Sequence, residues 1–237
     1  MKMKTKTASL KAAVAGVAII SLAACATDNP NRSRNIGAGV GAVAGAVLGN
    51  SVSGARGAPW VGAAVGAIAG GAVGNYMDKQ RAEMEQQLAK EAERDELHIS
   101  EMSDGSLRVG VASDISFEFN KAELTPAALQ TYGKIASVLQ SYDSTVIHVV
   151  GHTDTSGSAE YNQSLSVQRA AAVGNYFAQM GVSAARIREE GRGEREPLVR
   201  TGDNVKEARN RRVDIVIKPV VEGRESEAWT PPPYLGA

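Results

Sequence analysis

Residues 145–170 have the sequence TVIHVVGHTDTSGSAEYNQSLSVQRA, in which a run of β-branched residues leads through a short polar loop into a helical pattern. The β-branched run, residues 145–151, predicts a strand. Residues 159–180 predict a long helix that stops at Gly181, because glycine readily adopts the left-handed conformation found just after helices. The stretch therefore predicts a strand, a loop and a helix, with the polar loop at the end of the strand.

Further elements on both sides of this unit predict a domain over residues 107–219. They are expected over residues 109–119 (strand), 125–142 (helix), 187–191 (strand) and 211–218 (strand). The resulting order is β-α-β-α-β-β. This order predicts an α+β sandwich with the helices on a single sheet.

The helix predicted over residues 125–142 has clear signals at its start. Thr125 is a suitable N-cap, and Pro126 is tolerated in the first turn. We expect this helix to bury Leu129, Ile135, Val138 and Leu139. After the last strand, residues 220–237 include Pro231, Pro232 and Pro233, and this composition predicts a disordered or polyproline II tail.

Four ordered motifs in this domain resemble the OmpA-like peptidoglycan-binding domain. They are residues 117–124 (FEFNKAEL), 151–157 (GHTDTSG), 161–170 (YNQSLSVQRA) and 210–213 (NRRV). The resemblance implies that the domain holds the diaminopimelate residue of the peptidoglycan stem peptide without cleaving it. By motif position it implies that Asp154 and Arg169 are the binding pair. Asn120 stands where the family often has aspartate, which puts a contribution from the first motif in doubt.

The chemistry of the ligand agrees with this pair. An uncrosslinked diaminopimelate end is a zwitterion, so a compact receptor needs a carboxylate for its ammonium group and a guanidinium for its carboxylate. Asp154 lies just past a predicted strand end, and Arg169 lies about three turns along the next helix. The loop that starts at Thr155 also presents backbone N–H groups at a helix N-terminus, where an anion is favoured.

Other polar residues are expected to support the binding pair. Asn162 and Ser166 are predicted to orient the loop from the helix face. Arg212, and after it Arg211, is predicted to support the Asp154 side of the pocket, although either could be a charge at the sheet edge.

Two catalytic or metal-binding alternatives fit the sequence poorly. His148 and His152 would lie about 13 Å apart on an extended strand, too far apart to ligate one ion without a sharp bend. A hydrolytic triad of Ser164, His152 and Asp154 lacks a nucleophile-elbow motif, and its histidine and aspartate are close neighbours in sequence. We therefore expect no enzyme, metal or cofactor, while a hydrolase acting on wall peptides stays a weaker alternative.

The N-terminal residues 1–24 resemble a secretory signal peptide. An apolar run over residues 12–20 follows a basic start, and it is too short for a lasting membrane span, which needs about 20 residues. The sequence LAAC at residues 22–25 resembles the bacterial lipobox, which implies an acylated Cys25 that anchors the chain in the membrane through several acyl chains. Ala26 after the cysteine implies the outer membrane, with residues 25–35 as a lipidated tether and the folded domain in the periplasm.

Residues 36–77 contain 12 glycines, 11 alanines and a single charged residue, Arg56. Glycine recurs every four residues in two runs, which predicts a helical hairpin over residues 36–52 and 59–77, with a glycine groove on each helix. The pattern resembles the glycine-zipper segments of envelope lipoproteins. Glycine costs about 1 kcal/mol per residue in a soluble helix, so we expect this hairpin to insert in a bilayer or to self-associate into a homo-oligomer.

The charged segment over residues 78–98 predicts an exposed helix. Met77, Met84 and Leu88 form only a thin apolar stripe on it, so we interpret it as a solvated linker helix in preference to a short coiled coil.

Composition narrows the functional classes. The chain has 26 basic and 26 acidic residues, so it lacks the excess of positive charge expected of a nucleic-acid-binding protein. A single cysteine excludes an intramolecular disulfide framework and a multi-cysteine zinc site. The sequence thus predicts a lipid-anchored envelope protein that ties the outer membrane to peptidoglycan. In the alternative hypothesis the glycine zipper is the main functional unit and wall binding only positions it.

Overall fold

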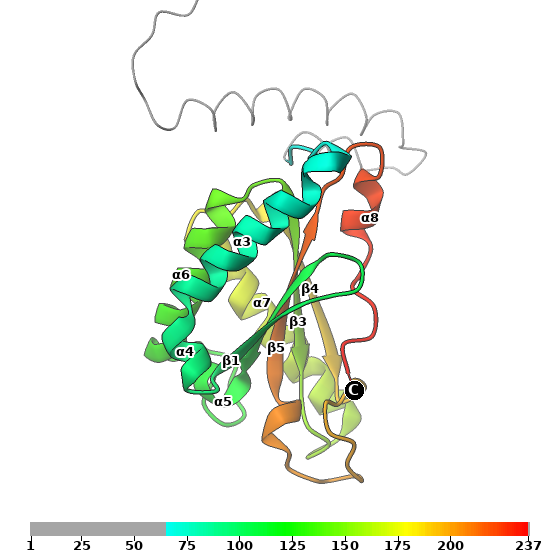
Figure 1. Cartoon of the computed structure of the whole chain (residues 1–237). Helices are drawn as coiled ribbons and strands as arrows, with labels where there is room; N and C mark the ends of the chain where they lie inside the picture. Colours follow the sequence, from blue (N-terminus) through cyan, green and yellow to red (C-terminus); the bar gives the residue numbers. More distant parts are fainter. Residues whose placement is uncertain (1–64, 237) are drawn as a thin grey trace, which may run out of the picture.

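The computed structural model describes residues 65–236, and their centre is one five-stranded sheet (Figure 1). The strands are β1 (Leu97–Glu101), β2 (Leu107–Ala112), β3 (Thr145–His152), β4 (Ile187–Gly193) and β5 (Arg212–Pro219). They lie in the order β1-β2-β5-β3-β4; β3 and β4 are parallel, and the other neighbouring pairs are antiparallel.

Helices cover one face of the sheet, which we call the helix face. Its main helices are α3 (Val73–Gln87), α6 (Pro126–Ser141) and α7 (Ala159–Gln179). Shorter elements connect the rest: η1 (Gly70–Ala72), α4 (Ala89–Glu93), α5 (Ser113–Ser116), η2 (Ala184–Arg186) and η3 (Ala208–Asn210). The predicted order β-α-β-α-β-β is confirmed as β2-α6-β3-α7-β4-β5.

The start of α6 follows the prediction. The Thr125 hydroxyl accepts a hydrogen bond from the Ala128 backbone N–H over 3.1 Å, and Pro126 occupies the first helical position. Ile135, Val138 and Leu139 are buried as expected, whereas Leu129 is 38% exposed. The prediction for Leu129 was wrong because the buried face of α6 runs through Ala128, Tyr132 and Ile135 instead.

The chain between β2 and α6 differs from the strand predicted over residues 109–119. The strand ends at Ala112, α5 follows, and Phe117 returns to extended backbone to pair with Leu124 in an isolated bridge. The fragment FEF therefore lies in a loop beside the sheet.

The charged segment is not a solvated linker helix. Met77, Met84 and Leu88 are buried in the main core, and Lys134 of α6 forms an ion pair with Glu91 over 2.6 Å. The thin apolar stripe is enough to attach this segment to the domain, because α6 packs against it. The helical part ends before Asp95, which adopts a φ of +59°, and the chain turns into β1, which pairs with β2.

The glycine-zipper prediction is tested only from residue 65 onward. Residues 65–69 are not helical, contrary to the helix predicted over residues 59–77, and α3 starts within that range at Val73. Ile68 instead pairs with Val221: its backbone N–H donates to the Val220 carbonyl over 2.7 Å, and its carbonyl accepts from the Glu222 N–H over 2.9 Å. These bonds replace the helical hydrogen bonds of a stretch whose glycines disfavour a helix.

The remaining predictions for the N-terminal part lie outside the described residues: the signal peptide 1–24, Cys25, the tether 25–35 and the zipper up to residue 64. Within residues 65–236, none of the helices has both the length and the apolar character needed to cross a membrane.

Residues 220–236, which we call the tail, pack against the second face of the sheet, the back face. The tail contains α8 (Glu225–Trp229), and Val220, Val221 and Leu235 are buried. The prediction of a disordered tail was therefore wrong, whereas the polyproline II alternative for residues 231–233 stays a prediction. The apolar side chains of Val146, Val150 and Val216 point to this face, and the tail removes them from water.

Candidate functional site

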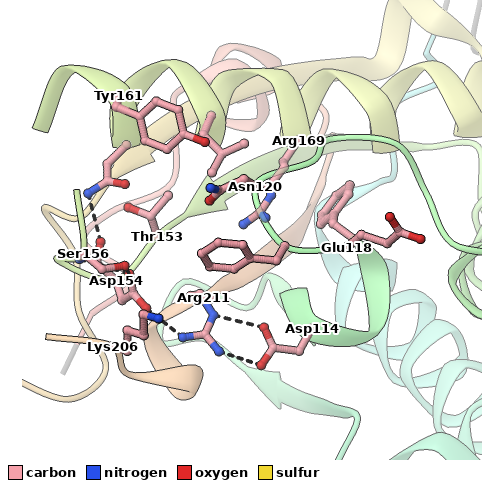
Figure 2. Close-up of a pocket in the computed structure, with 14 residues that line it drawn as sticks. Asp114, Glu118, Asn120, Thr153, Asp154, Ser156, Tyr161, Arg169, Lys206 and Arg211 are labelled. Atoms are coloured by element: carbon pink, nitrogen blue, oxygen red, sulfur yellow. Dashed lines mark hydrogen bonds and ion pairs between the residues drawn. The ribbon is translucent and has the colours of Figure 1, made fainter. Parts of the chain in front are cut away.

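A cleft of about 450 Å³ opens where β3 ends and β5 begins (Figure 2). Four segments supply its walls: the loop between β2 and α6, the loop after β3, the first turns of α7 and the loop before β5. The lining residues are Asp114, Phe117, Glu118, Phe119, Asn120, Thr153, Asp154, Ser156, Tyr161, Asn162, Leu165, Arg169, Lys206 and Arg211.

The glycines in the strands bring α7 to backbone distance from the sheet. A Cβ atom at Gly151 would lie 2.2 Å from the Ser166 carbonyl oxygen, and one at Gly191 would lie 2.4 Å from the Val167 nitrogen. No side chain fits at either position. The buried Ser166 hydroxyl accepts a hydrogen bond from the Gly193 N–H over 2.9 Å, which ties the helix to the end of β4. This close packing sets the position of Arg169 on the cleft wall.

Asp154 is 3% exposed and is surrounded by donors. Its Oδ1 accepts hydrogen bonds from the Ser156 N–H, over 3.1 Å, and from the Ser156 hydroxyl. Its Oδ2 accepts from the Glu207 N–H over 3.2 Å and from Arg211 Nη1 over 2.7 Å. Burial alone would raise the pKa of Asp154, but these donors outweigh it and hold the pKa below its usual value. Asp154 is thus an ionised carboxylate in a fixed orientation.

Arg211 joins two walls of the cleft. Its guanidinium donates to both carboxylate oxygens of Asp114, over 3.0 and 2.6 Å, as well as to Asp154. The hydrogen bonds that Arg211 donates to Asp114 and Asp154 raise the pKa of Arg211 above its ordinary value. Figure 2 shows these bonds as dashed lines.

Arg169 has a different environment, although it lines the same cleft. It is 5% exposed, and its Nε donates to the Lys121 carbonyl over 3.0 Å and its Nη1 to the Ser113 hydroxyl over 3.3 Å. The guanidinium carbon lies 4.9 Å from the centre of the Phe117 ring. Burial lowers the pKa of Arg169, and no acidic side chain between residues 65 and 236 forms an ion pair with it. A buried cation without an anionic partner is costly, so this position favours an anionic ligand.

Two other predicted residues fix the loops around the cleft. Asn162 lines it and donates from Nδ2 to the Asp154 carbonyl, over 3.1 Å, and to Glu194 Oε2, over 2.6 Å. Thr155 does not line it: its hydroxyl donates to the Gly202 carbonyl over 2.7 Å and accepts from the Val205 N–H over 3.1 Å. Thr155 therefore holds the loop before β5 from outside the cleft.

The prediction for Arg212 was wrong, because Arg211 supports Asp154 instead. Arg212 is buried under the back face, where its Nε donates to Asp214 Oδ2 over 2.9 Å. Successive side chains of extended backbone point to opposite faces. Only one of two adjacent arginines can therefore reach the cleft.

The first motif does contribute to the cleft, contrary to the doubt raised by Asn120. Phe117, Glu118, Phe119 and Asn120 all line it, and Asn120 adopts a φ of +57°, which asparagine tolerates better than most residues. The sequence prediction missed Asp114, Tyr161 and Lys206. Asp114 stands three positions before the FEF fragment, but its distance in sequence from Arg211 gave no sign of their pairing.

The histidines and Ser164 do not form the alternative sites. His148 bonds through Nε2 to the Ala228 carbonyl over 2.8 Å, and His152 Nε2 lies 3.2 Å from Asp214 Oδ2. The Ser164 hydroxyl accepts a hydrogen bond from Gln168. In the part of the chain that the structure describes, no group of three or more histidine, cysteine, aspartate or glutamate side chains could hold a metal ion.

Comparisons with known proteins cover nearly the whole chain. The OmpA family model matches residues 116–211, and the YMGG-like Gly-zipper model matches residues 3–78. Probable lipoprotein YiaD from Escherichia coli (strain K12) is 33% identical over 226 residues, which cover 92% of this chain and 100% of that protein. Outer membrane protein A from Shimwellia blattae is 39% identical over 119 residues, which cover 46% of this chain and 49% of that protein.

Solved structures share the fold of the C-terminal domain. A putative MotB-like protein from Desulfovibrio vulgaris superimposes with a TM-score of 0.55 at 24% identity, covering 62% of this chain and 93% of that chain. The cell wall anchor of the T6SS from Pseudomonas aeruginosa superimposes with a TM-score of 0.52 at 25% identity, covering 59% of this chain and 99% of that chain. The chain therefore belongs to the OmpA family, within the YiaD-like lipoproteins that join a glycine-zipper segment to an OmpA-like domain.

Proposed function

We propose that the cleft binds peptidoglycan non-covalently, through the diaminopimelate residue of an uncrosslinked stem peptide. The observation that carries this proposal is Arg169, a buried guanidinium that lines the cleft and forms no ion pair with any described acidic residue. A ligand carboxylate is the partner that this position lacks, because arginine and carboxylate form strong charge-assisted hydrogen bonds. The similarity to a cell wall anchor supports the same class of ligand.

In the proposed complex, the ligand carboxylate binds Arg169 and the ligand ammonium binds Asp154. The four acceptor positions of Asp154 are already used by Ser156, Glu207 and Arg211. The Ser156 hydroxyl is the donor that can leave most easily, because it only has to rotate about its χ1 angle. Its departure would free Asp154 Oδ1 for the ammonium group, and Phe117 and Leu165 would cover the methylene chain of the ligand.

We propose binding without cleavage. Both carboxylates that meet Arg211, those of Asp114 and Asp154, are engaged in ion pairs with it, and the described lining of the cleft contains no histidine. The third carboxylate of the described lining, Glu118, pairs with Lys121, so each of these carboxylates has a cationic partner that lowers its basicity as a general base.

The membrane end of the protein is proposed from its sequence and relatives. Acylation of Cys25 would anchor the chain in the outer membrane, with the OmpA-like domain in the periplasm, so that the protein ties membrane to wall. Labelling cells with radioactive palmitate tests this, because the wild-type chain would incorporate label and Cys25→Ala would not.

Whether residues 36–64 insert in the bilayer or form oligomers stays a prediction, which crosslinking after deletion of residues 37–64 would test.

Co-sedimentation with isolated diaminopimelate-type peptidoglycan tests the binding proposal. The full mature chain should pellet with the wall material, whereas Arg169→Ala and Asp154→Asn should stay in the supernatant. Arg209→Ala is the matched control, because Arg209 is exposed, pairs with Glu207 alone among the described residues and does not line the cleft. Unchanged pelleting of the Arg169 and Asp154 variants would refute the proposed site.

A further inference from the structure

The tail is held on the back face by buried polar groups that bind its backbone. Arg192 donates from Nη2 to the Pro232 carbonyl, over 2.8 Å, and from Nη1 to the Pro233 carbonyl, over 2.9 Å. Arg212 donates from Nη2 to the Leu235 carbonyl over 3.1 Å. Both arginines are buried. The tail thus satisfies guanidinium groups that would otherwise lose part of their hydrogen bonding inside the protein.

The contact also includes an acceptor and an apolar socket. The Leu235 N–H donates to Glu196 Oε2 over 3.0 Å, and the Leu235 side chain, 1% exposed, packs with Val150 and Val216. Burial of this leucine side chain stabilises the docked tail. Backbone recognition by charged groups, combined with a socket for one side chain, is the arrangement of a peptide-binding site. We call the socket and the groups of Arg192, Glu196 and Arg212 the tail groove.

The tail groove is connected to the cleft through the loop between β4 and β5. Glu196 binds the tail and also pairs with Arg192 over 2.9 Å. Glu194, two residues earlier, accepts a hydrogen bond from the cleft residue Asn162 over 2.6 Å. The same loop contributes the Glu207 N–H that binds Asp154. One loop is therefore fixed to the tail at Glu196 and to the cleft at Glu194, at Glu207 and at its last residue, Arg211.

We propose that the tail groove is a binding site for a proline-rich peptide, and that it is occupied by the tail of the same chain. Docking of the tail positions the loop of residues 194–211, which binds Asn162 and Asp154 and places its own Arg211 in the cleft. The tail lies on the opposite face of the sheet and does not line the cleft. It acts as a positioning element. Its effect on ligand affinity rests on the proposed function, whereas its effect on the loop does not.

A pair of truncated chains tests the proposal. The chain ending at Thr230 lacks every tail-groove contact made by residues 232–235, whereas the control chain ending at Gly236 keeps them all. Hydrogen–deuterium exchange of residues 194–211 and calorimetric affinity for a soluble diaminopimelate muropeptide are measured on both. We expect at least tenfold faster exchange and about tenfold weaker muropeptide binding in the chain ending at Thr230, with the control unchanged.

Addition of the missing segment provides the sharper test. The synthetic peptide TPPPYLG, residues 230–236, should bind the chain ending at Thr230 and restore both its slow exchange and its affinity. The same peptide with Leu235→Asp should do neither. If the truncated chain unfolds, as seen by circular dichroism, Leu235→Ala in the full chain replaces it for the exchange and affinity measurements.

The outcomes separate the two proposals. Wild-type exchange in residues 194–211 of both tail variants would overturn the role of the tail, whatever the ligand result. Faster exchange with unchanged muropeptide affinity would overturn the coupling to the cleft. If the wild-type chain binds no muropeptide while exchange still responds to the tail, the proposed function fails and the positioning of the loop stands.

Discussion

Arg211 and Arg212 are adjacent in sequence, but their guanidinium groups lie on opposite sides of the sheet. Arg211 Nη1 is 2.7 Å from Asp154 Oδ2 in the cleft, and Arg212 Nε is 2.9 Å from Asp214 Oδ2 under the back face. At the start of β5, one side chain therefore lies in the candidate ligand site, and the next lies in the buried interior of the domain.

Because the two arginines lie in different environments, substitution of Arg212 should mainly lower stability, whereas substitution of Arg211 should mainly impair ligand binding. Arg212→Ala should lower the free energy of unfolding by about 3 kcal/mol, because the buried Asp214 loses a charged partner. Arg211→Ala should cost less, about 1 kcal/mol, because Asp154 keeps the Ser156 and Glu207 donors and Asp114 is exposed to solvent, yet it should abolish pelleting with peptidoglycan. Urea unfolding and co-sedimentation of both variants check this. Equal losses of stability would contradict the division.

Acidification should destabilise the domain because of its buried histidines. Burial lowers the pKa of His148 and of His152, so both are neutral in the folded chain, while the unfolded chain takes up protons below about pH 6.5. Their contribution to stability is complete above that pH and is lost as the pH falls through the folded pKa values. The free energy of unfolding should therefore decrease from pH 7.5 to pH 5.

A histidine substitution identifies the source of this pH dependence. His148→Gln removes the titrating group but keeps a donor for the Ala228 carbonyl, so urea unfolding of this variant should vary less between pH 7.5 and pH 5. The matched control for the substitution itself is His98→Gln, at an exposed position. A wild-type slope in His148→Gln would assign the effect to other groups.

The buried stripe of α3 makes the charged segment part of the folded domain. Met84→Ala should lower the free energy of unfolding by about 2–5 kcal/mol, because a fully buried side chain leaves a cavity. Arg81→Ala, on the exposed side of the same helix, should change it far less. Thermal unfolding of the two variants measures the difference. A solvated helix would show no such difference.

The order of strands and helices could be predicted because each element carries a strong local signal. Thr125 and Pro126 mark the start of α6, and the β-branched run marks β3. The pair Asp154 and Arg169 could be placed in one cleft because motif resemblance supplied the long-range information. Local patterns could not decide between Arg211 and Arg212, because that choice depends on the residue at which β5 begins.

The failures of prediction involve contacts between distant parts of the chain. A proline-rich composition predicts disorder for the tail, but Leu235 finds Val150 and Val216 on a sheet face that local sequence does not reveal. Likewise, the apolar stripe of α3 is buried because α6 packs against it. Asp114 lines the cleft, where it pairs with Arg211, a residue distant in sequence. Each depends on tertiary packing, which overrides local propensity.

Calorimetric binding of two muropeptides, identical except that the free carboxylate of the diaminopimelate residue is amidated in one, tests the central role of Arg169 most directly. The loss of a charge-assisted hydrogen bond corresponds to about 1.5–3 kcal/mol. The wild-type chain should therefore bind the amidated ligand about 10–150-fold more weakly, and Arg169→Ala should bind both ligands equally weakly. Equal affinity of the wild-type chain for the two ligands would contradict the account.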